Sequence, residues 1–566
     1  MKTLKSQIQE IVELAYQKDF GSTSKPASIE YCDIKFGHFA TNIALANSKE
    51  LGVSPAQIST VLAKSLANND IFESVEVQEP GFINMRLKPQ LLLEVMQESH
   101  DNVLGGLTDL AQGEKMVIDY SHPNIGKPMG VHHLLSTVIG DSIKRLYRKA
   151  GYQVIADNFI GDMGTQFGKL IHAVKTWGDM EKIENNPVPE LLKLYVRFHV
   201  EAETDDELDQ SGRAEYKKLE EGDAENRALL KKIQTWSMAE ILALYDELDV
   251  EFDHFNGESF YEDKIAAVVQ LGKEKGIFTI SQGALVCHTD NPDEPPAIIL
   301  KKDGTSLYLT KDLARIAYWQ KTWSPDYMVN VVDIAQSLHL KQVYEVSAKL
   351  NLTKASNIHV AFGRMQFAQG SMSTRKGNII LIEDLLVETK NRVRKQIVEL
   401  SKDLTPEESS DLVDILAINS LKYNILRQNR LSNISFDWDN MLSLEGNSAP
   451  YLAYSAVRMQ AIARLSEEKA TLPAINTTSL DRVEVELILQ ISRATEVFAS
   501  AASGFDPSNI ANYCYELCRM YNSFYHTHRV VEEDAVLSHR LLINNTTLRV
   551  LEACFEVLGL KLPAKM

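Results

Sequence analysis

The chain has 566 residues, more than a single compact core organises, and we expect three or four domains. Hydrophobic residues make up 44% and charged residues 24% of it, and it has no run of about twenty apolar residues, which excludes a membrane-spanning protein. The formal net charge of -18 excludes indiscriminate binding to polyanions such as DNA, because phosphate backbones attract clustered Lys and Arg.

Residues 1–110 are expected to form a small α/β domain. The first twenty place Leu4, Ile8 and Val12 at helical spacing with charges between them, which predicts an amphipathic helix of a cytoplasmic protein and not a secretory signal. Two more helical stretches and the alternating strands FESVEVQ and GFINMRL follow. The five cysteines are scattered without zinc-ligand spacing, so no structural metal is expected.

Residues 111–390 are predicted to form a Rossmann-like catalytic domain. EKMVIDYSHPN is an apolar strand entering a Pro-Asn loop, a helix follows over 132–150, and GYQVIA is the next strand, the order that begins a doubly wound parallel sheet. The charged, helical stretch at about 176–260 indicates an insertion. Further strands are expected within GALVCHT, AIILKKDG, SLYLT, DYMVNVVD and NIHVAFG.

From about residue 382 the pattern is helical to the end of the sequence. We expect a helical connector over 391–440 and an α-helical domain over 441–566. The predicted fold class is therefore α/β: a Rossmann-like core with a parallel sheet, an N-terminal α/β domain and a C-terminal helical bundle.

The loop SHPNIGKPMGVHH, which joins the first core strand to its helix, carries the chemistry. Such a loop presents unpaired backbone N–H groups and a partial positive charge at the carboxyl edge of the sheet, where anions bind. Lys127 adds a mobile cation, His133 a donor, and Asn124 an amide able to fix an amine or a carboxylate. A capped polar turn is the alternative, but the density of these groups favours an anion site.

Pro-Asn-Ile-x-Lys followed by His-x-x-Ser-Thr-x-Ile-Gly-Asp resembles the ATP-binding loop of class I aminoacyl-tRNA synthetases, in the form found in arginyl-tRNA synthetases. Further segments resemble that family in family order: FGHFATNIAL, NFIGDMGTQFGKL, FDHFNGESFY, DGTSLYLTKDLA, DIAQSLHLKQV, SMSTRKGN and EGNSAPYLAYSAVRMQAIARL. The resemblance implies a ligase that activates L-arginine with ATP and Mg²⁺, releases pyrophosphate, and transfers the arginyl group to the 3′ end of tRNA(Arg). It implies no tightly bound cofactor.

The resemblance also implies which residues form the sites. Asp312 corresponds to the carboxylate that receives the substrate's guanidinium group, a partner suited to charge-assisted hydrogen bonds. The implied arginine-binding residues are His122, Asn124, His133, Tyr308, Asp312 and Gln336. The implied ATP-binding residues are Pro123, Lys127, Gly130, His133, Met372 and Ser373. The implied catalytic residues are Lys127, His132, His133, Arg375 and Lys376. The implied tRNA contacts are Tyr451, Tyr454, Arg458 and Asn512.

Two positions depart from the general class I pattern. Thr374 stands where a lysine is common in SMSTRKGN, and the resemblance implies that Lys127 serves in its place. The usual His-x-Gly-His is Gly130-Val131-His132-His133 here, so either His132 reaches the phosphates from an altered turn or ATP binding is weakened. We expect this loop to bind ATP, because the residues that the resemblance assigns to the arginine pocket are all present in the sequence. A catalytically silent tRNA-binding relative is the alternative function, and lysine is the competing amino acid.

Overall fold

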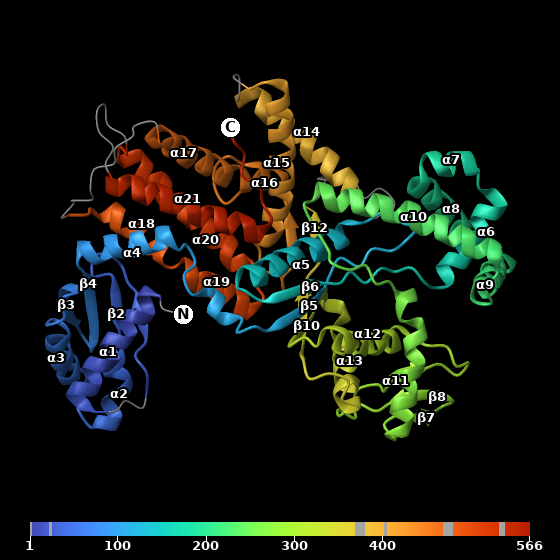
Figure 1. Cartoon of the computed structure of the whole chain (residues 1–566), viewed down its shortest axis with the longest axis horizontal. Helices are drawn as coiled ribbons and strands as arrows, with labels where there is room; N and C mark the ends of the chain where they lie inside the picture. The colour runs from blue at the N-terminus through green and yellow to red at the C-terminus, as the bar shows by residue number, and fades with distance from the viewer. Residues whose placement is uncertain (1–2, 22–24, 368–379, 401–403, 468–478, 531–537) are drawn as a thin grey trace. The chain divides into compact units, whose positions relative to one another are not determined.

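The computed structural model describes residues 3–21, 25–367, 380–400, 404–467, 479–530 and 538–566 (Figure 1). The chain divides into two compact units. Unit 1 comprises residues 1–112, 149–151 and 442–566, and unit 2 comprises 113–148 and 152–441. Among the described helices, none is both long and apolar enough to cross a bilayer.

The centre of unit 2 is a four-stranded parallel sheet with the order β11-β10-β5-β6. Its strands are β5 (Lys115–Asp119), β6 (Gln153–Ala156), β10 (Tyr327–Asp333) and β11 (Ser356–Phe362). Helix α5 (Val131–Lys149) lies on one face, and α12 (Tyr308–Trp323) and α13 (Ser337–Leu350) lie on the other (Figure 1). Val117 and Met328 from the strands pack with Leu313 and Val346 from these two helices. The predicted parallel sheet and the helix after its first strand are confirmed.

One predicted strand is wrong. SLYLT enters α12, which begins at Tyr308, because Leu309, Leu313 and Ile316 recur at helical spacing and bury one face of the helix. The strands before it, β7 (Thr279–Ser281), β8 (Ala284–Cys287) and β9 (Ala297–Leu300), form a separate antiparallel sheet. The Thr310 hydroxyl donates to the carbonyl of Ile299 and so ties the start of α12 to β9.

The insertion is helical, as predicted, and gathers at one end of unit 2 (Figure 1). Its helices are α6 (Thr165–Trp177), α7 (Met180–Asn185), α8 (Pro187–Ala202), α9 (Asp206–Glu220) and α10 (Ala224–Glu247). Helices α6 and α9 cross at two glycines: a Cβ on Gly168 would lie 2.2 Å from the carbonyl oxygen of Gly212. Phe198 fills the small core beside this crossing. The later helices of unit 2 are α14 (Ile382–Leu400), α15 (Pro406–Leu426) and α16 (Trp438–Leu442).

Unit 1 joins the two ends of the sequence. An antiparallel sheet has the order β1-β2-β4-β3, with β1 (Ile29–Tyr31), β2 (Phe39–Thr41), β3 (Phe72–Gln78) and β4 (Phe82–Leu87). Its helices are α1 (Leu4–Phe20), α2 (Ile43–Leu51), α3 (Pro55–Leu66), α4 (Pro89–Asp101), α17 (Ala449–Glu467), α18 (Arg482–Ser492), α19 (Ala494–Gly504), α20 (Ser508–Thr527) and α21 (Ser538–Leu558). The Tyr31 hydroxyl lies 3.3 Å from Glu496 Oε1, and the Arg493 guanidinium lies 4.8 Å from the Tyr31 ring. The N-terminal sheet therefore contacts the C-terminal helices.

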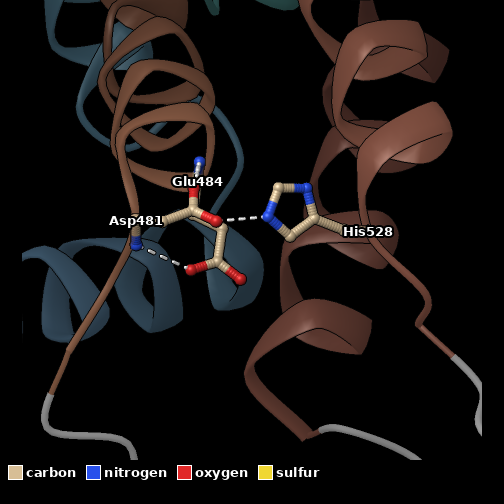
Figure 2. A group of neighbouring side chains, drawn as sticks. All are labelled: Asp481, Glu484 and His528. Carbon is tan, nitrogen blue, oxygen red and sulfur yellow. Dashed lines mark hydrogen bonds and ion pairs between the residues drawn. The ribbon is translucent and has the colours of Figure 1, made fainter.

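Figure 2 shows Asp481 and Glu484 at the start of α18, facing His528. Their ligand atoms are close enough to share a cation. Both carboxylates already have protein partners, however: Asp481 caps the amides of Val483 and Glu484, and Arg540 donates to Glu484 at 2.7 Å. Capping and charge pairing account for this cluster.

Candidate active site

A sharp turn follows β5 at the carboxyl edge of the parallel sheet. Asp119 ends the strand fully buried, and the next residues include Ser121 and His122 at φ +81° and +55°. Residues with side chains seldom adopt this region, so the fold must hold them there. The Ser121 N–H donates to Ser136 Oγ at 2.9 Å, and its hydroxyl lies 2.7 Å from the Tyr245 hydroxyl. These contacts hold the turn at Ser121 and His122, from which the loop after β5 begins.

Asn124 is fixed between the loops that follow β5 and β6. The Ile125 N–H donates to the carbonyl of Gly161 at 3.0 Å, and the Gly161 N–H donates to that of Pro123 at 2.9 Å. A Cβ on Gly161 would lie 2.3 Å from Asn124 Oδ1, so only glycine fits there. The Asn124 amide is therefore set at the sheet edge, where the sequence predicted it.

The altered segment Gly130-Val131-His132-His133 forms the first turn of α5. The Gly130 N–H donates to Nδ1 of His133 at 3.1 Å, and the His133 N–H donates back to the Gly130 carbonyl at 2.9 Å. Since Nδ1 accepts, the neutral His133 ring carries its proton on Nε2 and can donate there. His133 is buried and His132 is exposed, with 3.9 Å between their ring centres. The exposed ring is the one free to reach a ligand.

Burial, together with the neighbouring rings of His132 and His122, lowers the pKa of His133 to about 3. The ring is therefore neutral throughout the physiological range.

This shift predicts that acid destabilises the first turn of α5. Between pH 6.5 and 3 the unfolded chain protonates His133 and the folded one does not, so its contribution to the unfolding free energy falls as the pH falls below about 6.5. At pH 5 the loss is about 2 kcal/mol for a group of ordinary unfolded pKa. We expect the Tm of the His133→Asn variant to fall less between pH 7.5 and pH 5 than that of the original chain. Equal falls would contradict the assignment.

Lys127 faces the insertion. Its ammonium lies 4.2 Å from the centre of the Tyr195 ring on α8, a cation–π contact. One turn later on the same helix, burial lowers the pKa of His199, and the charges of Lys169 and Lys127 lower it further. Tyr195 of the insertion therefore contacts Lys127, the residue that the sequence assigned to ATP binding.

Asp312 lies on α12, 7% exposed, with a side-chain nitrogen close to each oxygen. Arg315 Nη2 is 2.9 Å from Oδ1, and His339 Nε2 is 2.7 Å from Oδ2. On the same helix Lys311 is 2.6 Å from Glu258. Both oxygens of the Asp312 carboxylate therefore meet N–H groups of the protein, and its role toward the guanidinium group of a substrate stays a prediction.

Two other predicted pocket residues, Tyr308 and Gln336, are exposed to solvent. Tyr308, one turn before Asp312 on α12, is 65% exposed. Gln336 ends η3 (Ile334–Gln336), directly after β10, and is three residues from His339. Met372, Ser373, Arg375 and Lys376 lie outside the described residues.

Comparison with known proteins agrees with this geometry. The family model for the catalytic domain of class I arginyl-type (R) tRNA synthetases matches residues 99–438, the arginyl-tRNA synthetase N-terminal domain matches 2–87, and the DALR anticodon-binding domain matches 452–566. An arginine–tRNA ligase of Fusobacterium nucleatum is 38% identical, with 94% of each chain covered. The chain belongs to the arginyl-tRNA synthetases. The synthetase is also 35% identical to an arginine–tRNA ligase of Clostridium perfringens, covering 100% of this chain and 99% of the relative.

Solved structures agree. The arginyl-tRNA synthetase of Plasmodium falciparum superimposes with a TM-score of 0.81 at 27% identity, with 100% of both chains covered. That of Thermus thermophilus gives 0.82 at 21% identity with the same coverage, which supports the fold. The family and fold class inferred from the sequence are therefore confirmed for this synthetase.

The predicted tRNA-contacting residues of the synthetase share a surface of α17 and α20. The Arg458 guanidinium lies 4.6 Å from the Tyr454 ring, and its Nη1 donates to Asn522 Oδ1 at 3.0 Å. Asn522 in turn donates to the Tyr451 hydroxyl at 2.9 Å. Asn512, on α20, accepts from the side chain of Asn447 at 3.3 Å. Tyr454 is 45% exposed, so this surface presents an aromatic ring to solvent.

Sequence reasoning missed four residues of the synthetase that surround the predicted site. Asp119 ends the first core strand and gave no signal beyond its polarity in an apolar run. Arg315 lies three residues after Asp312, a spacing that places both on one helix face. His339 lies in DIAQSLHLKQV and Tyr195 in the insertion, and only the folded chain brings them to Asp312 and Lys127.

Proposed function

We propose that the chain activates L-arginine with MgATP to form arginyl-adenylate, releases pyrophosphate, and transfers the arginyl group to the 3′ end of tRNA(Arg). This activity places the protein in the cytoplasm, where tRNA is charged. Its proposed domains are those predicted from the sequence: the N-terminal domain over 1–110, the catalytic domain with its insertion over 111–390, the helical connector over 391–440 and the C-terminal helical domain over 441–566.

The observation that carries this proposal is the environment of Asp312. A buried carboxylate that is expensive to ionise is retained only where cations meet it. Both of its oxygens accept N–H donors here, one from a guanidinium group and one from an imidazole. The planar fork of an arginine side chain suits such a carboxylate better than the point charge of lysine does. Tyr308, one turn earlier, then covers the substrate side chain, and Gln336 adds an amide.

The other end of the amino acid would meet the loop after β5. Asn124 is held at the sheet edge by the exchange between Pro123 and Gly161, and it would orient the α-amino or carboxylate group. Neutral His133 would donate from Nε2 to the substrate carboxylate or to ATP. Activation needs the carboxylate placed in line with the α-phosphate, and positioning of this kind is the main contribution of such a site.

The phosphates would be bound by cations and by the turn at Gly130. His132, exposed in the first turn of α5, would reach them, and Lys127 would leave the Tyr195 ring to do so. Met372 and Ser373 would bind ATP, and Arg375 and Lys376 would serve catalysis there. Developing charge on the α-phosphate is then stabilised by fixed donors, with no covalent intermediate on the protein.

The C-terminal helices would bind the anticodon region of tRNA. Tyr451, Tyr454, Arg458 and Asn512 offer stacking and hydrogen-bonding groups of the kind that recognise unpaired bases. The contact would be local, because the chain as a whole is acidic.

The test is attachment of radiolabelled arginine to total tRNA by the purified protein with ATP and magnesium, with lysine in a parallel reaction. We expect arginine to be attached and lysine to be rejected. Attachment would also establish that Gly130-Val131-His132-His133 is a working loop. If tRNA binds, the protein is folded and neither amino acid is attached, the catalytically silent relative is the correct alternative, with His132 as the obstacle to ATP.

A further inference from the structure

A row of ion pairs and hydrogen bonds links three elements at the candidate site. His122 Nε2 lies 2.9 Å from Asp119 Oδ2 at the end of β5, and Arg315 on α12 donates to the same oxygen. Arg315 also reaches Asp312, whose second oxygen meets His339 on α13. Asp119 and Arg315 are 0% and 5% exposed. The row therefore runs from the loop after β5 to the carboxylate proposed for the substrate.

Arg315 lies among groups that bind a guanidinium ion. Its Nη groups meet the two carboxylates, and Nη2 also donates to Asn330 Oδ1 at 3.0 Å. Its Cζ atom lies 4.7 Å from the centre of the Phe159 ring and 4.9 Å from that of the Trp319 ring. Nε is buried without a hydrogen-bond partner in the described part of the chain. Two anions, an amide and aromatic faces are the groups that bind a guanidinium ion most strongly.

The buried carboxylates of Asp119 and Asp312 need the positive charge of Arg315 between them. Asp119 is desolvated, which by itself raises its pKa, and the opposing charges of His122 and Arg315 bring the pKa of Asp119 below its usual range. Without Arg315, two buried carboxylates would share the site with no full cation between them. One of them would then be driven toward the protonated form.

We propose that Arg315 is a positioning residue for arginine: it holds Oδ1 of Asp312 so that Oδ2 is presented to the substrate's guanidinium group. The inference rests on the proposed function and deepens it. His339 occupies Oδ2 in this structure and is the group that the substrate displaces or joins. Through Asp119 and His122, the same guanidinium ties the side-chain end of the pocket to the loop that meets the amino-acid backbone.

Chemical rescue distinguishes positioning from simple structural support. The Arg315→Ala variant leaves a hole of guanidinium shape between two carboxylates. We expect its KM for arginine to rise by about tenfold or more, as when a charge-assisted hydrogen bond is lost, with a smaller change in the KM for ATP. Guanidinium ion, added well below unfolding concentrations, should restore much of the arginine KM, and ammonium at the same concentration should not.

Arg145→Ala is the matched control. Arg145 lies on α5 and pairs with Asp141 at 2.7 Å and Asp249 at 3.0 Å, away from Asp312 and its partners. Its removal also breaks two ion pairs, one of them with the buried Asp141, but the arginine KM should change less than twofold and show no response to guanidinium. Equal rescue of both variants would overturn the proposal, as would an arginine KM in Arg315→Ala close to the original value.

Arg315→Lys is the second variant in case Arg315→Ala does not fold. It keeps the charge and loses the fork, so the arginine KM should rise while the protein stays folded; an unchanged KM would overturn the proposal. Arginylation by the unmodified chain is measured first. If the unmodified chain does not arginylate tRNA, the proposed function is wrong. If it does, but the Arg315 variants keep the arginine KM of the unmodified chain, only the positioning role of Arg315 is wrong.

Discussion

Replacing Asp312 with Asn is expected to raise the KM for arginine by about tenfold or more, because a hydrogen bond to a charged group contributes roughly 1.5 to 3 kcal/mol. Asn keeps the shape of the side chain but removes the charge. One of its termini becomes a donor and faces Arg315 or His339, which are donors themselves. The KM for ATP should change little. Steady-state arginylation at varied arginine and ATP checks this.

Asp263→Asn provides the control for Asp312. Asp263 is an exposed carboxylate on α11 (Glu262–Glu274) that pairs with Lys264 at 2.7 Å. Such surface pairs contribute little, and arginine saturation should not change. If arginine saturation is also unchanged in Asp312→Asn, Asp312 does not belong to the pocket.

Replacing Lys127 with Ala is expected to lower kcat by about a hundredfold, the size of the loss when one donor to a developing anion is removed. The affinity for arginine should change far less, because the ammonium serves the phosphates. ATP–pyrophosphate exchange, run with tRNA present, measures the activation step separately from transfer. Unchanged ATP and arginine kinetics would show that Lys127 does not replace the lysine absent at Thr374.

Lys169→Ala is the matched control for Lys127. Lys169 belongs to the insertion, pairs with Asp209 at 2.6 Å and lies 5.7 Å from the Phe198 ring. It thus has the same charge and a similar aromatic contact without a proposed role at ATP. Its loss should leave the exchange rate near that of the original chain. A similar fall in both variants would indicate a general effect of charge in the insertion.

The local pattern of the sequence determined the elements and their order. Strand, Pro-Asn loop and helix after residue 114 predicted the parallel sheet and the edge at which Asn124 lies. Charged helical spacing predicted the insertion, and the motifs predicted the family. The pattern failed at SLYLT, because a short apolar run fits a strand or a buried helix turn equally well, and only contact with β9 and the core decided for α12.

Tertiary structure alone decided which charges meet. Asp119 and Arg315 are 196 positions apart, and no periodicity links them. The same holds for Lys127 with Tyr195 and for Asp312 with His339. Periodicity reports which face of an element is buried, because that depends on neighbours three or four residues away. A buried ion pair depends instead on how two elements pack against each other, and that packing cannot be read from the local sequence pattern.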